Sequence, residues 1–203
     1  MKTKEMDKIT KHFDKCFEQT DSMVIHPIVD NGFHIDVLLY KPNDKYPFWK
    51  LVTMGASDYK MPKLPYMLGR FNEYMMFVDK DEDLGDRDVV AWYYAKLMMI
   101  ASYARAHSVH ITYGNSIEWG NDDPESEMMA AYIEMPQIIS NTGVLRCKLG
   151  LFKTVICLQT ILLNQVDLNQ LKKIGPEAFS YYLYPEHNGK PHFLAEKHRS
   201  ERF

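Results

Sequence analysis

The alternation of apolar and polar positions is clearest between residues 32 and 62. Residues 33–40 alternate at first and then become continuously apolar, which is typical of a strand that enters a core. Residues 48–54 are aromatic, aliphatic and β-branched and are followed by Gly55. The two runs are separated by turn-forming residues at positions 42–44. We therefore predict a hairpin whose second strand leads into a polar corner at residues 55–59.

Helical and strand periodicity predicts the other elements. Charged and apolar positions at helical spacing predict an amphipathic first helix over residues 4–19 and a long helix over about residues 88–107, begun by an aspartate that can cap its free amides. We also predict two short helices, at 167–174 and 176–184, and further strands at 22–29, 71–78, 109–117, 128–133, 144–149 and 152–163. The two most apolar strands, 71–78 and 152–163, should lie centrally. The expected fold is α+β, a mixed and largely antiparallel sheet packed against a long central helix with flanking helices.

Length and composition indicate an ordinary globular protein. The chain has 203 residues, of which 46% are hydrophobic and 25% charged, so one core is sufficient for it. We expect a single domain over residues 1–185 and a polar, basic tail, mobile in part, over residues 186–203. The apolar runs of the whole chain are shorter than the ~20 residues that a membrane-spanning helix needs. The first twenty residues carry charge throughout and have no signal-peptide core, so we expect a cytoplasmic location.

Net charge and cysteine spacing limit the classes of partner and of cysteine site that the chain can have. A net charge of -3 gives no general attraction to nucleic acid or to an anionic membrane, so we expect neither as a direct partner. Cys16, Cys147 and Cys157 are widely spaced and form no C-x-x-C pair. That pattern favours buried, reduced thiols over a disulfide framework or a cysteine zinc site.

The Gly55-Ala56-Ser57 sequence invites comparison with the nucleophile elbow of hydrolases. The elbow has the form G-x-S-x-G and leads into a helix. Here Tyr59 replaces the second glycine, and Pro62 stands where the helix should continue. We favour a corner in which Ser57 and Asp58 cap backbone amides, and a hydrolase acting at residues 55–58 is the weaker alternative.

Two patterns resemble metal sites without matching one. Asp79, Asp81 and Asp83 have the spacing of a calcium loop, but Leu84 replaces its glycine and Val90 replaces its glutamate. A solvated acidic loop explains these charges.

Histidines give the second pattern. His26, His34, His107 and His110 could meet in space, and His34 lies on the same strand face as Asp36. Their spacing is not that of a known ligand set, and histidines in sheets are more often hydrogen-bonded structural residues. We therefore expect no metal site and no cofactor.

An acidic segment is the best binding candidate from residue types alone. It surrounds Trp119 and contains Glu118, Asp122, Asp123, Glu125 and Glu127. Exposed aromatic residues beside charge are typical of recognition surfaces, and such a loop would meet a basic surface such as the substrate groove of a nuclease. The alternative is a solvated loop with no binding role.

Several segments together resemble one known family. His34-Ile35-Asp36, followed by Leu51-Val52-Thr53-Met54-Gly55-Ala56-Ser57-Asp58, is similar to the signature of the suppressor-of-fused domain family. Later segments agree in order, at residues 72–77, 114–119 and 155–163, together with the helix that contains Trp92 and the Met135-Pro136 pair. The resemblance covers roughly residues 20–185. It implies the same α+β fold.

The resemblance also implies a function. Animal members look like non-catalytic binding proteins that hold a transcription factor through a peptide added to the sheet. Tyr103 and Asn115 fall at that groove, although the animal pattern has an acidic residue in place of Asn115. The vertebrate members carry a second, C-terminal domain that this chain is too short to hold.

Stand-alone bacterial members resemble this chain in size, and several look like immunity proteins or antitoxins encoded beside toxins, including DNase toxins. The leading hypothesis is a bacterial protein that binds and blocks a toxin by occlusion, without turnover. A scaffold that binds an endogenous peptide by strand addition is a second hypothesis. The predicted partner-binding residues are Asp58, Tyr59, Tyr103, Asn115, Glu118, Trp119, Asp122 and Asp123.

Overall fold

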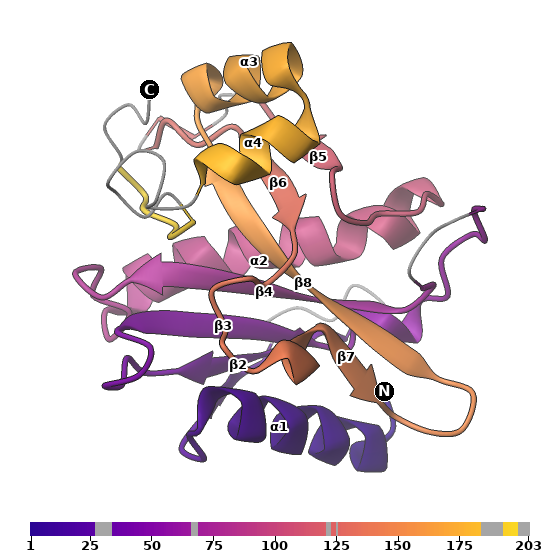
Figure 1. Ribbon diagram of the computed structural model, residues 1–203. Helices are drawn as coiled ribbons and strands as arrows, with labels where there is room; N and C mark the ends of the chain where they lie inside the picture. Colours follow the sequence, from indigo (N-terminus) through magenta and orange to yellow (C-terminus); the bar gives the residue numbers. More distant parts are fainter. Residues whose placement is uncertain (27–33, 66–68, 121–122, 125, 184–192, 199–203) are drawn as a thin grey trace.

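The computed structural model describes residues 1–26, 34–65, 69–120, 123–124, 126–183 and 193–198. Within them, eight strands form one sheet (Figure 1). Seven strands follow the order β1-β2-β3-β4-β8-β6-β5, and β7 pairs with β8 beside that path. Their bounds are β1 Met23–Ile25, β2 Asp36–Tyr40, β3 Phe48–Met54, β4 Asn72–Asp79, β5 Ser116–Glu118, β6 Ala130–Glu134, β7 Arg146–Lys148 and β8 Thr154–Leu163.

Antiparallel pairing dominates this sheet. Among the pairs of described strands, only β4 and β8 are parallel, with Asn72 opposite Ile156 and Met76 opposite Thr160. Both strands are buried along nearly their whole length, as their largely apolar sequences predict. The prediction of a mixed, largely antiparallel sheet with these two strands at its centre is confirmed.

Helices cover both faces of the sheet. Helix α1 (Thr3–Phe17) packs against the face that contains Leu38 and Phe77, whereas α2 (Arg87–His107) packs against the face that contains Val37 and Leu39 (Figure 1). Successive residues of β2 thus enter opposite cores, as the two-residue period of a strand requires. Helices α3 (Gln165–Ile174) and α4 (Pro176–Tyr182) close a third apolar cluster around β6 and the end of β8.

Helices α2 and α3 begin slightly earlier than the sequence pattern predicts. Asp86, rather than Asp88, caps α2, and its carboxylate accepts hydrogen bonds from the amides of Asp88 at 2.8 Å and Val89 at 3.1 Å. Helix α3 is capped by Asn164, and Asp167, which we placed at the first position, completes a capping box from the third helical position. In each helix the residue that accepts the free amides lies just before the apolar pattern starts.

The predicted strand over residues 109–117 is wrong for most of its length. Only Ser116–Glu118 is a strand, and the residues before it form a turn. The Asn115 side chain accepts a hydrogen bond from the amide of Thr112 at 2.8 Å, and Gly114 has a φ of 87°. This side-chain bond competes with strand pairing, which alternation of residue types does not reveal.

Other strand boundaries are shorter than predicted. The first strand ends at Ile25, and residues 27–29 of that prediction lie outside the described residues. The hairpin strand predicted from residue 33 starts at Asp36, and residue 33 is likewise outside. A short 3-10 helix, Thr142–Leu145, replaces the start of the strand predicted at residues 144–149.

Part of the expected C-terminal tail belongs to the fold. The amide of Ala195 donates to the carbonyl of Phe77 at 2.7 Å, and the amide of Asp79 donates to the carbonyl of Ala195 at 3.2 Å. Leu194 and Ala195 are buried. The segment 193–198 therefore extends the packing at the end of β4.

The cysteines and the apolar character of the helices can be compared with the predictions. Cys16, Cys147 and Cys157 are all buried and unpaired, as expected for structural thiols. None of the helices described here combines the length and the apolar character that crossing a bilayer requires.

Candidate functional site

The corner after β3 is built on a buried carboxylate. Glu73, on β4, accepts hydrogen bonds from the Thr53 hydroxyl at 2.7 Å and from the amides of Gly55, Ala56 and Ser57 at 3.0, 3.2 and 3.1 Å. Burial raises the pKa of Glu73, and these donors oppose that shift because they favour the charged form. The prediction that Ser57 and Asp58 cap the corner is therefore wrong, since Glu73 binds the amides instead.

The position of Ser57 bears on the hydrolase alternative. Its side chain is buried, and the Ser57 hydroxyl is one of the groups that lower the pKa of the Glu73 carboxyl. A serine nucleophile needs a base within hydrogen-bond reach and an open path to substrate. The arrangement around Glu73 instead gives the corner a structural role.

A cavity of about 220 Å³ opens beside this corner. Asp58 and Tyr59 line it, together with His34 before β2 and with Ala101 and Arg105 on α2. Two of the predicted partner-binding residues therefore lie together, at the junction of the sheet and the C-terminal half of the long helix.

An apolar hairpin tip projects near the same corner. The tip joins β7 to β8, and the amide of Leu149 donates to the carbonyl of Lys153 at 2.9 Å across its base. Leu151 is 96% exposed and Phe152 is 97% exposed. Lys153 links the tip to the corner because its ammonium lies 3.5 Å from the carboxylate of Asp58. We call Leu151, Phe152, Lys153 and Asp58 the hairpin surface.

Of this surface, Asp58 was predicted from the sequence, but Leu151, Phe152 and Lys153 were missed. The strand predicted over residues 152–163 placed Phe152 in the core, whereas β8 begins at Thr154. The available signal was Gly150 directly before two adjacent apolar residues and a lysine, which is a pattern of turns rather than of strand interiors.

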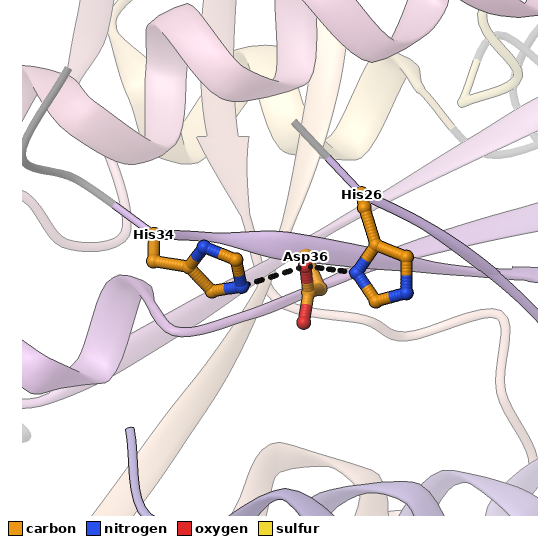
Figure 2. Close-up of side chains that lie close together, drawn as sticks. All are labelled: His26, His34 and Asp36. Carbon is orange, nitrogen blue, oxygen red and sulfur yellow. Dashed lines mark hydrogen bonds and ion pairs between the residues drawn. The ribbon is translucent and has the colours of Figure 1, made fainter. Parts of the chain in front are cut away.

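Two of the four candidate histidines meet at one carboxylate. Asp36 lies between the imidazole rings of His26 and His34 (Figure 2), with Oδ1 2.9 Å from Nδ1 of His26 and 3.2 Å from Nε2 of His34. His107 instead stacks on Tyr103, and Nδ1 of His110 lies 2.8 Å from the carbonyl of Pro62. Within the described chain, only one group of three or more histidine, cysteine, aspartate or glutamate side chains is placed to share a metal ion. It consists of His26, His34 and Asp36.

Comparison with known families agrees with this arrangement of strands and helices. A model of the family described as Suppressor of fused protein (SUFU) matches residues 32–189, which is well over half of the chain. The chain belongs to the suppressor of fused family. A comparison with curated protein sequences finds no relative of this SUFU domain.

Solved structures show the same fold at low sequence identity. A SUFU homolog from Neisseria gonorrhoeae superposes with a TM-score of 0.72 at 12% identity, over 100% of this chain and 98% of that one. Drosophila Suppressor of Fused gives a TM-score of 0.69 at 13% identity, over 96% of this chain and 50% of that one. A Sufu–Fu complex gives a TM-score of 0.64 at 14% identity, over 94% and 88% of the two chains.

Acidic side chains around Trp119 have partners within this SUFU domain. Glu118 forms an ion pair with Lys172 at 2.8 Å. Asp123 accepts a hydrogen bond from the indole of Trp92 and lies 3.5 Å from the ammonium of Lys96. The indole of Trp119 itself donates to the carbonyl of Met128 at 3.0 Å. Asp122 lies outside the described residues. The carboxylates of Glu118 and Asp123, which were predicted from the sequence to bind a partner, thus have ion-pair partners within the domain.

Tyr103 and Asn115 serve local structure. Tyr103 is half-buried, and its ring centroid lies 4.2 Å from that of His107 one helical turn later. Asn115 closes the turn before β5 through its bond with Thr112. No described hydrogen bond, ion pair or ring contact joins Tyr103 to Asn115. Their assignment to a peptide groove stays a prediction from the family resemblance.

Proposed function

We propose that this SUFU domain is a protein-binding domain that holds a partner without turnover, and that it is an immunity protein that neutralises a toxin. The observation that carries the proposal is the hairpin surface. Leu151 and Phe152 are both more than 90% exposed on a short hairpin. Large apolar side chains held in this way gain most of their binding energy by entering a pocket of another protein.

Burial of Leu151 and Phe152 in a partner would supply a substantial part of the binding free energy. Fully burying a leucine or phenylalanine side chain contributes about 1.5–3 kcal/mol. Both side chains are presented by a hairpin whose base is closed by hydrogen bonds from the amides of Leu149 and Gly150 to the carbonyl of Lys153, so little backbone freedom is lost on binding. Two such anchors are enough to form the centre of an interface.

Charges beside the tip would orient the partner. Lys153 lies 3.2 Å from Glu5 and 3.5 Å from Asp58, and its ammonium stands 5.5 Å from the centre of the Phe71 ring. Mixed charge around an apolar centre is the usual arrangement of a protein interface. It supports a protein partner rather than nucleic acid or a membrane.

The relatives support the same class of function. A solved relative is a Sufu–Fu complex, and a second is a bacterial protein of almost the same extent as this chain. A toxin with nuclease activity is the partner class that the resemblance to stand-alone bacterial members favours. Blocking it requires only tight association over its active surface.

The test begins with the neighbouring reading frame. We expect a toxin encoded directly beside this gene and expect co-expression of this chain to restore growth. Kd for the purified toxin, measured by calorimetry, should rise about 30-fold in Phe152→Ser, which corresponds to ~2 kcal/mol. Val166→Ser, at a 37% exposed position on α3, is the matched control and should bind like wild type. Absence of protection would refute immunity, and unchanged affinity in Phe152→Ser and Leu151→Ser would remove the hairpin surface from the interface.

Strand addition is the second candidate, and the edge strand β1 favours it. Within the described residues β1 pairs only with β2, and Met23 and Val24 are 46% and 44% exposed. Such an edge can accept a further strand. Met23→Lys should weaken a partner bound at this edge and leave a partner bound at the hairpin surface unaffected.

A further inference from the structure

The cluster of His26, His34 and Asp36 joins the ends of two neighbouring strands. His26 directly follows β1, and Asp36 begins β2. One ligand atom from each of the three side chains lies within 4.8 Å of the other two (Figure 2). The side chain of Asp36 is 0% exposed, whereas those of His26 and His34 are 66% and 55% exposed.

The carboxylate of Asp36 is incompletely satisfied. Oδ1 contacts both imidazoles, but Oδ2 is buried and has no hydrogen-bond partner in the described part of the chain. A buried carboxylate is costly unless opposite charge or several donors surround it. Among the described residues, no hydrogen-bond donor therefore compensates the burial of Oδ2.

A divalent cation would supply the missing charge. We propose that His26, His34 and Asp36 bind one divalent transition-metal ion, for which Zn²⁺ is the physiological type. Two imidazole nitrogens and a carboxylate oxygen are a donor set that such ions prefer over Ca²⁺ or Mg²⁺.

The three ligand atoms could reach the geometry of a zinc site through small movements of the side chains. Zinc bonds of about 2.0–2.1 Å place tetrahedral ligand atoms about 3.3 Å apart. Oδ1 of Asp36 lies 2.9 Å from Nδ1 of His26 and 3.2 Å from Nε2 of His34, so both separations are already near this value. The ion would replace the two direct contacts. Because both rings are more than half exposed, they can rotate without disturbing the core.

Metal binding would have a structural and a binding consequence. The ion would fix the end of β1, a strand of three residues, onto β2 and so stabilise the edge of the sheet. Three protein ligands leave a fourth position open to water or to a group from another molecule. His34 also lines the cavity beside Asp58, so that position would lie next to the candidate binding surface.

The experiment uses the full, untagged chain after treatment with a chelator. Isothermal titration with ZnCl₂ should give one ion per chain, and Zn²⁺ should raise Tm. His26→Ala and His34→Ala should each weaken binding at least tenfold, and the double variant should lose both the binding and the rise in Tm. Both positions are exposed, so these variants should fold. His107→Ala, at another exposed histidine, is the matched control and should bind like wild type.

Spectroscopy identifies the ligands independently. Co²⁺ in place of Zn²⁺ should give visible absorption in wild type and in His107→Ala, and none in the double variant. Asp36→Asn should weaken Zn²⁺ binding and keep the circular dichroism spectrum of the folded chain. Absence of one-to-one binding, or equal Zn²⁺ affinity in the double variant and wild type, would overturn the proposal.

Discussion

The backbone amide of Ser57 donates a hydrogen bond to the buried carboxylate of Glu73 at 3.1 Å. This bond joins β4 to the corner that follows β3, and two neighbouring amides and the hydroxyl of Thr53 converge on the same carboxylate. The cavity beside Asp58 and Tyr59 lies against this corner. The shape of the candidate binding region thus depends on one side chain that never reaches the surface.

Replacing Glu73 with glutamine should therefore be strongly destabilising. The amide group keeps one acceptor oxygen but turns a donor toward backbone amides, which leaves buried N–H groups unpaired. We expect the free energy of unfolding to fall by about 3 kcal/mol, measured by urea denaturation. Glu177→Gln, on the exposed side of α4, should change it little. Equal stability of the two variants would contradict the role assigned to Glu73.

Lys50 predicts a dependence of stability on pH. Its ammonium is buried among aromatic rings and donates to the carbonyl of Lys41 at 2.7 Å. Burial lowers the pKa of Lys50 to about 8, below the value of about 10.4 expected in the unfolded chain. Between these two values the unfolded chain binds more protons, so the contribution of Lys50 to stability should increase as pH rises.

Lys50→Met isolates this effect. The variant has no titrating group at this position and should be at least as stable as wild type at pH 7. The difference in the free energy of unfolding between the two proteins should shift in favour of wild type between pH 8 and pH 10. Denaturation of both proteins across this range measures the shift, and a difference that does not change with pH would show that the pKa of Lys50 is not lowered.

The positions of the strands could be predicted from the sequence more accurately than the contacts between side chains. Residues 48–54 were predicted with their observed bounds because a β-branched and aromatic run lies between Pro47 and Gly55. The family resemblance and the order of the strands gave the fold. The sequence did not indicate what the buried polar residues bind. Glu73 lies in a strand predicted to be central, but its role in binding the amides after β3 was not predicted.

The candidate site is formed by residues that are far apart in the sequence, and local sequence patterns do not show which of them meet. His34 and Asp36 were recognised as neighbours on one strand, but His26 joins them only through the pairing of β1 with β2. Phe152 was assigned to a strand that begins two residues later. Asp123 was treated as a free charge, although Trp92 and Lys96, about 30 residues earlier, bind it.

Charge reversal at Asp123 should consequently act on folding. Asp123→Lys removes the acceptor of the Trp92 indole and places a second ammonium beside that of Lys96, which is only 15% exposed. We expect a loss of about 1–2 kcal/mol in the free energy of unfolding. Glu18→Lys reverses the partner of an exposed ion pair with Lys45 and should cost much less. If both reversals have the same small effect in urea denaturation, Asp123 is available for a partner after all.

Gly55 is the position where the corner tolerates no side chain. Its φ is 135°, and a Cβ atom there would lie 2.5 Å from the carbonyl oxygen of His34 and 3.0 Å from Cα of Ile35. Backbone atoms cannot yield as a flexible side chain can, so Gly55→Ala must displace β2 from the corner. We expect a loss of about 2 kcal/mol or more, measured by thermal and urea denaturation. Gly150→Ala is the matched control because a Cβ atom there meets nothing within 4 Å. A Gly55→Ala variant as stable as Gly150→Ala would mean that β2 can move at this point, and the spacing of His34 and Asp36 would then not be fixed by the corner.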